Sequence, residues 1–357
     1  MAGHPEVYFG AGSAQELENV FPNHKFHLLH IPEVSDQRLK QIRSYLSGRI
    51  VSQKTYQAGM PDLAMVRQMQ NNFWSQDSKI YSDSALLAIG GGSLMDLAKV
   101  LRFKPTHPDW LNDHLNLNLS DVATHQLPLI LMPTTAGTGS EVTPTATIWD
   151  FEHQKKHSFF GSAVFANIAI VDSQLSSGAP WKITRDSALD ALSHALEAIW
   201  NKNRSGEASQ LAILAAKNIC LHLPVLQVDL DNQEARERLA EASLAAGLAM
   251  AKTQTALVHA LSYEDTAATY KSHGESCANW LPYVWQMLIE SGCDERVKRE
   301  VDDAVGACFS SPQQMRDWLF KLGVGSQDPN NKNEALLNRI LVLKSSPRGG
   351  NFLGFSN

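Results

Sequence analysis

Apolar residues in the first half of the chain gather in short continuous runs that stop at glycine or proline. Residues 85–89 (ALLAI) end at Gly90, and residues 129–132 (LILM) end at Pro133. Such runs are typical of strands buried on both faces of a parallel sheet. The pattern predicts strands at 26–31, 49–51, 85–89, 129–132 and 168–171, with helices at 36–46, 61–74 and 93–102. This alternation indicates a doubly wound α/β domain.

The spacing of apolar residues becomes helical from about residue 184 onward. Helices are predicted at 187–201, 206–223, 233–251, 255–270, 278–291, 297–308 and 311–321. Just before this change lies a segment rich in turn formers, residues 176–180 (SSGAP). The sequence therefore predicts an α/β domain over 1–180 and an all-helical domain over 181–357. The last stretch, 345–357, is expected to be an irregular tail.

Composition narrows the class of protein. The chain has 357 residues, of which 43% are hydrophobic and 19% charged, as in soluble globular proteins. A net charge of −6 gives no basic surface for nucleic acid, and we find no apolar run of the roughly 18 residues that a membrane span needs. The four cysteines have no C-x-x-C spacing, and the N-terminus does not resemble a signal peptide. We expect a reduced, cytoplasmic protein.

Asp190 and His194 lie four residues apart in an apolar stretch, residues 189–197 (LDALSHALE). A helix with apolar residues on nearly every side is buried, and this spacing puts both side chains on one face of it. A buried carboxylate needs a positive partner. A divalent metal would satisfy both residues, and His259 and His273 could complete a four-ligand site. The spacing alone is at chance level, because Asp121 and His125 share it in a polar run, and burial leaves a hydrogen-bonded core pair equally open.

Two glycine-rich segments follow predicted strands. Residues 90–93 (GGGS) open a predicted helix, where free N–H groups suit a phosphate; a tight turn without a ligand is the alternative. Residues 133–141 (PTTAGTGSE) offer hydroxyls and N–H groups that suit a pyrophosphate and a nicotinamide ribose or amide, or else form a hydroxyl-rich capped turn. Neither segment matches the G-x-G-x-x-G fingerprint of dinucleotide-binding folds.

Taken together and in order, these segments resemble the iron-containing (group III) alcohol dehydrogenase family. The resemblance rests on residues 8–13, 90–99, 133–141 and 190–197, and on His259 and His273-Gly274. It implies a dehydroquinate synthase-like architecture, in which an NAD(P)-binding α/β domain with a parallel Rossmann-like sheet precedes an all-α metal-binding domain. The active site would lie in the cleft between the two domains.

The resemblance also implies a set of site residues. The metal ligands would be Asp190, His194, His259 and His273, holding one divalent ion, either Zn2+ or Fe2+. The cofactor-binding residues would be Gly91, Gly92, Ser93, Asp96, Thr134, Thr135, Thr138, Ser140 and Lys156. We favour NAD over NADP because no arginine follows the first predicted strand to receive a 2′-phosphate. Tyr263 stands where the family often has a histidine, and it could stack on the cofactor, donate a proton or fill space.

The implied reaction is oxidation of a primary alcohol to an aldehyde. The metal would act on the substrate oxygen as a Lewis acid while hydride passes to the nicotinamide. The branch suggested by the overall pattern acts on the C8 hydroxyl of 3-deoxy-D-manno-octulosonate, in amino-sugar lipopolysaccharide biosynthesis. Such an acidic sugar requires a cation, and the candidates are Arg102, Lys156, Arg185 and Lys252.

Other functions fit the same motifs. Within the family, the alternatives are a small-alcohol dehydrogenase and a phosphonoacetaldehyde reductase. Outside it, a lyase of the dehydroquinate synthase type shares the architecture, and a noncatalytic nucleotide-binding protein would keep the loops without turnover. The partners we expect are a small alcohol or aldehyde and a second copy of the chain in a homodimer.

Overall fold

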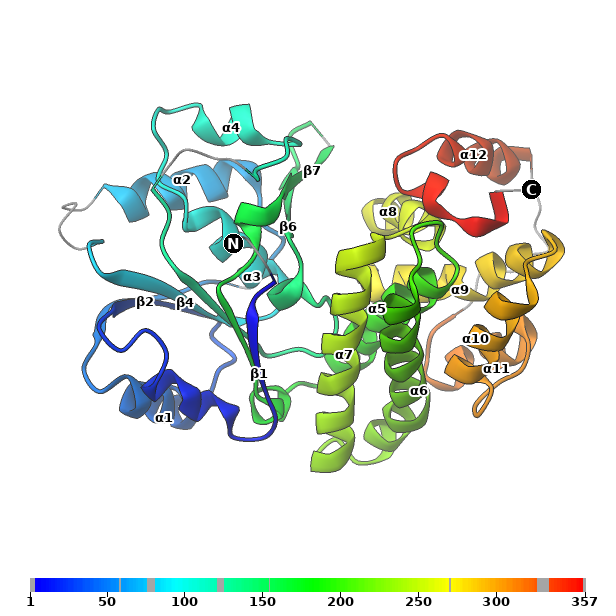
Figure 1. The fold of residues 1–357 in the computed structure, drawn as a ribbon, viewed down its shortest axis with the longest axis horizontal. Helices are drawn as coiled ribbons and strands as arrows, with labels where there is room; N and C mark the ends of the chain where they lie inside the picture. Colours follow the sequence, from blue (N-terminus) through cyan, green and yellow to red (C-terminus); the bar gives the residue numbers. More distant parts are fainter. Residues whose placement is uncertain are drawn as a thin grey trace. The chain divides into compact units, whose positions relative to one another are not determined.

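The computed structural model describes residues 4–57, 59–75, 81–120, 125–153, 155–269, 271–325 and 334–355. The chain divides into two compact units (Figure 1). The sheet unit comprises Met1–Thr135 and Ser140–Gly178, and the helical unit comprises Ala136–Gly139 and Ala179–Asn357. The main division falls two residues before the predicted one at 180. The sequence did not predict that four residues from the middle of the first half belong with the helices.

The sheet unit is built on six parallel strands, so the predicted α/β fold with a Rossmann-like sheet is confirmed. In spatial order they are β1 (Glu6–Phe9), β8 (Ile168–Val171), β5 (Leu129–Pro133), β4 (Ser84–Gly90), β2 (Lys25–His30) and β3 (Ile50–Thr55). Every residue of β4 and β5 is buried, which explains their continuous apolar sequences. Gly90 pairs with Pro133 at the ends of these strands, so the two glycine-rich segments start at the same sheet edge.

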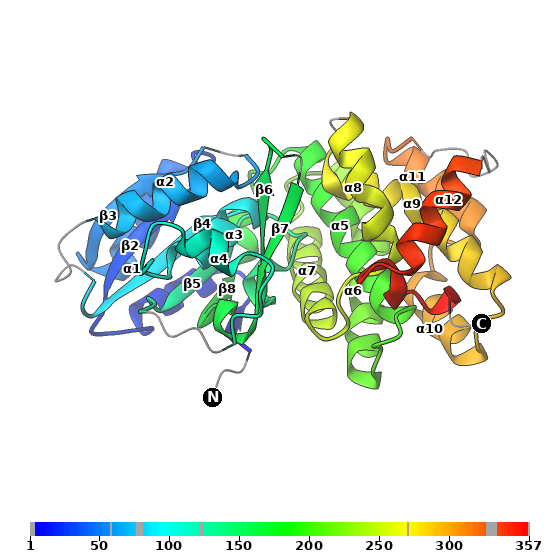
Figure 2. The same cartoon turned by 90° about the horizontal axis from the view of Figure 1, so that it is seen from above.

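Helices lie on both sides of this sheet in Figure 1, and Figure 2 looks down on one of the two sides. These helices are α1 (Asp36–Leu46), α2 (Leu63–Trp74), α3 (Gly92–Leu101) and α4 (Trp110–His114). Alternate residues of β4 enter different cores: Leu86 and Ala88 join the cluster under α2 and α3, whereas Leu87 and Ile89 join the cluster under α1. The sheet unit is therefore a three-layer sandwich with two separate apolar cores.

An antiparallel hairpin, β6 (Thr145–Asp150) and β7 (Lys155–Phe160), was not predicted from the sequence. Its strands bury few side chains, chiefly Ala146, Ile148 and Phe159. The remaining positions are polar or partly exposed, so the hydrophobic alternation that signals a strand is weak.

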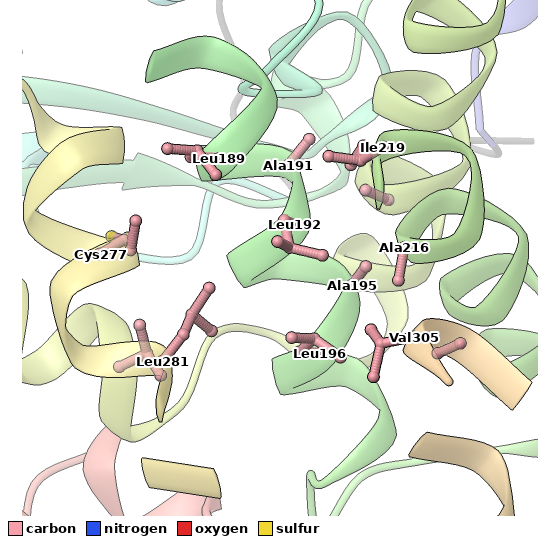
Figure 3. Packing of buried hydrophobic residues seen from close by; sticks show 14 of the residues in the cluster. Leu189, Ala191, Leu192, Ala195, Leu196, Ala216, Ile219, Cys277, Leu281 and Val305 are labelled. Atoms are coloured by element: carbon pink, nitrogen blue, oxygen red, sulfur yellow. The ribbon is translucent and has the colours of Figure 1, made fainter. Parts of the chain in front are cut away.

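The helical unit is arranged around α5 (Trp181–Ile199). Residues 188–199 of this helix are all buried, and Figure 3 shows its leucines between α6 and α9. The other helices are α6 (Gly206–Val228), α7 (Gln233–Thr253), α8 (Leu257–Thr269), α9 (His273–Glu290), α10 (Glu295–Val305), α11 (Pro312–Lys321) and α12 (Glu334–Lys344). The predicted all-helical second half is confirmed, although α12 was missed and α9 starts five residues before its predicted start at 278.

Two features of this unit qualify the sequence interpretation. By length and composition, α6 is the one helix in the described part of the chain that could cross a membrane. The search for a continuous apolar run did not identify it. A helix in the core of a folded unit passes the same test, and α6 packs Ala212, Ala216 and Ile219 into the core. The tail beyond 345 is irregular as predicted, but it is anchored, because Phe352 is fully buried.

Candidate metal and nucleotide sites

Three helices bring the three predicted histidine ligands around the carboxylate of Asp190. Asp190 and His194 come from α5, His259 from α8 and His273 from the first turn of α9. The Oδ1 atom of Asp190 lies 3.8 Å from Nε2 of His194, 3.6 Å from Nε2 of His259 and 3.8 Å from Nε2 of His273. Ligand atoms about 2.1 Å from one tetrahedral ion are about 3.4 Å apart. The three distances from Asp190 are therefore close to those between ligands of one metal ion.

Unpartnered buried atoms support the same interpretation. Oδ1 of Asp190 and Nε2 of His259 are buried and have no hydrogen-bond partner among the described residues. Buried polar atoms in folded proteins almost always have partners. One carboxylate and three imidazoles suit Zn2+ or Fe2+, so the residues present fit a divalent metal. The second Asp-x-x-x-His pair offers no comparison, because Asp121 lies outside the described residues.

The pKa values of Asp190 and His194 are shifted toward the forms that bind metal, whereas that of His259 is raised well above its usual range, so a metal would displace a proton there. Burial alone would raise the pKa of Asp190, but His194 and the other two histidines hold it well below its usual range. Burial lowers the pKa of His194 to about 4, against the opposing effect of Asp190. At neutral pH the site therefore offers a carboxylate and a neutral imidazole, which are the forms that bind metal.

Glu197, one turn beyond His194, fixes the orientation of His259. Its carboxylate lies 2.7 Å from Nδ1 of His259 and accepts hydrogen bonds from the backbone N–H groups of Ala256, Val258 and His259. With Nδ1 held in this way, Nε2 is directed at Asp190. The sequence analysis gave Glu197 no role, although a carboxylate on an almost wholly apolar helix was a signal that it must have buried partners.

Tyr263 and Arg348 lie beside this centre. The Tyr263 ring is parallel to that of His273, at 3° and 5.7 Å between centroids. The guanidinium carbon of Arg348 is 5.1 Å from the centroid of the Tyr263 ring. Burial lowers the pKa of Arg348 while Glu197 opposes the shift, and an arginine remains charged under such conditions. The sequence analysis missed Arg348 because it assigned no function to the irregular tail.

The first glycine-rich segment forms the start of α3. Gly91 is the N-cap residue and makes no side-chain capping bond, and Gly92 and Ser93 form the first turn. The N–H groups there remain available to a phosphate. On the neighbouring strand, the Thr134 N–H donates to the carbonyl of Gly90 at 3.0 Å, and the Thr134 hydroxyl is buried without a hydrogen-bond partner among the described residues. The first residues of the two predicted phosphate-binding segments thus lie side by side in the sheet unit.

Asp96 and Ser140, both predicted to bind the cofactor, form hydrogen bonds within the sheet unit. The carboxylate of Asp96 accepts hydrogen bonds from Ser140 Oγ at 2.7 Å and from the Thr147 N–H at 2.8 Å. Lys99, fully buried, donates to the same Ser140 hydroxyl and to the carbonyls of Thr143 and Thr145. These bonds fasten residues 140–147 to α3. Lys156, also predicted to bind cofactor, lies on β7 with Nζ 5.6 Å from the ring of Trp149.

The middle of the second segment packs in the helical unit instead. A Cβ atom on Gly137 would lie 2.7 Å from the backbone and side chain of Ser187, and one on Gly139 would lie 2.5 Å from the Cα of Gly247. Gly139 also has a φ of +61°. Only glycine allows these close approaches. Thr138, between them, therefore belongs to the helical unit, whereas Thr134, Thr135 and Ser140 belong to the sheet unit.

All four cations considered for an acidic substrate have contacts within the protein, and that of Lys156 with Trp149 is described above. Arg102 donates to the carbonyls of Leu127 and Phe165, Arg185 pairs with Asp186 and Glu275, and Lys252 pairs with Glu207. Arg348, over the ring of Tyr263, is a cation close to the proposed metal centre that the sequence analysis did not consider.

Comparison with known proteins identifies the family. The model for iron-containing alcohol dehydrogenase matches residues 5–173, and the model for the C-terminal part of the Fe-containing alcohol dehydrogenase family matches residues 184–345. The chain belongs to the iron-containing alcohol dehydrogenase family. The predicted resemblance is confirmed.

Several members of this family are similar to the chain. Long-chain-alcohol dehydrogenase 1 of Geobacillus thermodenitrificans is 36% identical over 225 residues, which cover 62% of this chain and 55% of that protein. The match thus spans little more than half of that relative. NADPH-dependent butanol dehydrogenase of Clostridium saccharobutylicum is 27% identical over 89% of this chain and 80% of its own. The structure of sulfoacetaldehyde reductase from Bifidobacterium kashiwanohense in complex with NAD+ superimposes with a TM-score of 0.81 at 26% identity, covering 99% of this chain and 95% of that one.

Proposed function

We propose that this member of the iron-containing alcohol dehydrogenase family is a metal-dependent oxidoreductase that interconverts a primary alcohol and an aldehyde with NAD. The observation that carries the proposal is the convergence of three imidazoles on the carboxylate of Asp190, whose inward oxygen has no other partner among the described residues. The NAD+ complex of the similar sulfoacetaldehyde reductase supports the choice of cofactor. The butanol dehydrogenase named for NADPH leaves NADP as the alternative to test.

The site residues would have three separate roles: holding the metal, orienting a ligand and binding the pyrophosphate. Asp190, His194, His259 and His273 would hold the metal, while Glu197 keeps the His259 ring in the binding orientation. A bound divalent metal supplies Lewis-acid polarisation of the substrate oxygen, and the nicotinamide supplies the hydride chemistry. Gly91, Gly92 and Ser93 would hold the pyrophosphate through N–H groups at the start of α3.

We further propose that the substrate carries an anionic group. Arg348 supports this proposal because it places a positive charge next to Tyr263, which stacks on the metal ligand His273. Sulfoacetaldehyde, named for the similar structure, is itself an anion. Oxidation of the C8 hydroxyl of 3-deoxy-D-manno-octulosonate is the narrowest form of this proposal and rests on the sequence resemblance alone. Reduction of phosphonoacetaldehyde, also an anion, is the alternative reaction within the family.

A substrate screen on the purified, metal-analysed protein tests the proposal. Matched substrate pairs share a four-carbon skeleton and differ in the negative charge. They are 4-hydroxybutyrate against 1-butanol for oxidation, and succinate semialdehyde against butanal for reduction. Sulfoacetaldehyde, phosphonoacetaldehyde and 3-deoxy-D-manno-octulosonate complete the panel, each with both nicotinamide cofactors. We expect the anionic member of each pair to have the higher kcat/KM. Net formation of NADH excludes a dehydroquinate synthase-type lyase, and NAD binding without turnover of any alcohol or aldehyde would point to a noncatalytic protein.

The Arg348→Gln variant tests the anionic group separately. Since a hydrogen bond to a charged group contributes about 1.5–3 kcal/mol, kcat/KM for 4-hydroxybutyrate should fall at least about tenfold, whereas that for 1-butanol should change less than about twofold. Arg348→Lys keeps the charge and should retain part of the preference. Equal losses on both alcohols would give Arg348 a structural role only, and would leave the proposed reaction intact.

A further inference from the structure

Cys277 lies one helical turn after His273 on α9 and is fully buried. Its Sγ atom is 3.8 Å from Nε2 and 3.9 Å from Nδ1 of His273. Figure 3 shows Cys277 on α9 beside α5, the helix that also carries Asp190. The thiol is therefore next to the proposed metal centre although neither the sequence motifs nor the family resemblance assigned it a function.

The sulfur shares one small space with three of the four assigned ligands. The ligand-capable atoms of Asp190, His259, His273 and Cys277 all lie within 4.8 Å of one another. Two of these donors, Oδ1 of Asp190 and Nε2 of His259, are the buried atoms that lack hydrogen-bond partners among the described residues. An ion near the midpoint of this group would be within reach of the sulfur, because zinc–sulfur bonds of about 2.3 Å are longer than zinc–nitrogen bonds of about 2.0–2.1 Å.

We propose that the Cys277 sulfur is a further ligand of the metal and biases the site toward Zn2+ over Fe2+. On binding, the thiol releases its proton to solvent and a metal–sulfur bond forms, without any change in oxidation state. A thiolate is a soft ligand that favours zinc, whereas one carboxylate and three imidazoles alone suit both metals. This inference rests on the metal site of the proposed function, and it adds a ligand that changes the metal expected there.

Cobalt substitution tests the inference directly. The protein is stripped with a chelator and titrated with Co2+ alone, without substrate or nicotinamide, and its absorption spectrum is recorded. A cobalt–thiolate bond gives an intense near-ultraviolet charge-transfer band, which imidazole and carboxylate ligands do not produce. We expect this band to appear in proportion to bound Co2+ in the wild-type protein and to vanish in Cys277→Ser. The Zn2+ affinity of the same variant, measured by chelator competition, should fall at least about tenfold, since even residues that only support ligands cost 10–100-fold.

Cys293→Ser is the matched control, because Cys293 lies beyond the end of α9 and outside the cluster. This variant should keep both the charge-transfer band and the Zn2+ affinity. Stoichiometric Co2+ binding that shows only visible d–d bands would overturn the role of Cys277 and leave the metal site of the proposed function standing. Failure of wild-type protein to bind Co2+ or Zn2+ at all would overturn both. The wild-type spectrum decides the question even if Cys277→Ser does not fold.

Discussion

Two buried glutamates illustrate how differently single residues are accommodated in this chain. Glu197 is completely buried and accepts hydrogen bonds from three backbone N–H groups in addition to its contact with His259. For Glu141 of the sheet unit, burial raises the pKa to about 7, although its own backbone N–H and Lys99 oppose the shift. One carboxylate is thus built into a fixed network, while the other retains its proton close to neutral pH.

The raised pKa of Glu141 predicts a dependence of stability on pH. Between its ordinary value of 4.5 and about 7, the folded state binds the proton more tightly than the unfolded state does. Stability is therefore full below pH 4.5 and declines as the pH rises toward 7. Glu141→Gln removes this decline, so the variant should become more stable than wild type above pH 7, by up to about 3 kcal/mol.

Urea unfolding at pH 5 and pH 8 measures the effect. The difference between Glu141→Gln and wild type should grow with pH, and the exposed-residue control Glu207→Gln should show no such trend. A constant difference across this range would mean that Glu141 titrates normally in the folded protein.

Metal content provides the second prediction at the scale of residues. His194→Ala removes a proposed ligand 3.8 Å from Asp190 and should lower the metal content of the purified protein. Glu197→Gln keeps the size of the side chain but weakens its hold on His259, so metal affinity should fall about 10–100-fold. Elemental analysis and chelator competition measure both. A full complement of metal in purified His194→Ala would remove that histidine from the ligand set.

Among the elements, the crossing of α9 over α5 sets the geometry of the proposed metal centre. A Cβ atom on Gly274 would lie 1.8 Å from the carbonyl oxygen of Asp186 and 3.2 Å from the Cβ of Asp190. The two helices thus meet backbone to backbone, immediately beside His273. Only glycine permits this approach, and any side chain there must push the helices apart.

Gly274→Ala should therefore destabilise the protein by about 1–3 kcal/mol through overpacking, and should weaken metal binding because His273 moves away from Asp190. Gly178→Ala, where an added Cβ meets nothing within 4 Å, is the control and should change neither property. Urea unfolding and metal titration report the two effects. Normal metal affinity in Gly274→Ala would show that the site tolerates separation of the helices.

Sequence analysis found the elements whose buried apolar residues are either continuous or regularly spaced. Strands β4, β5 and β8 and the helices from α5 to α11 were predicted because their burial is continuous or periodic. The hairpin β6–β7 escaped because it buries only a few residues. The start of α9 was missed because its first turn is polar, although the N-cap Ser272 was a sequence signal for it.

Prediction of the site had a similar limit. The apolar setting of Asp190 pointed to a helix on which the structure gathers candidate ligands, but Arg348 and Cys277 depend on neighbours that only the tertiary fold supplies. The resemblance identified His259 and His273, whereas spacing alone left a core pair equally open. Residues whose function comes from distant contacts have no local sequence pattern to reveal them.

At the scale of the whole molecule, metal binding should stabilise the two units unequally. All of the proposed ligands lie in the helical unit. A metal at 100 times its Kd stabilises the folded form that binds it by about 2.7 kcal/mol. Hydrogen exchange with and without Zn2+ should show slower exchange in α5, α8 and α9 and little change in β2, β4 and β5. Equal protection of the sheet strands would mean that the units unfold together.

The chain enters the helical unit twice, first for Ala136–Gly139 and again from Ala179 onward. Ala136 packs against the helical core, and Gly137 and Gly139 fit against α5 and α7 where no side chain could. A gene segment cut at residue 178 would therefore encode helices that lack four of their own residues. Recombination between two relatives at that point would combine residues 136–139 of one protein with the helices of the other, against which these residues did not evolve. The two halves should consequently be inherited together, and chimeras should succeed only when residues 136–139 are exchanged along with the C-terminal half.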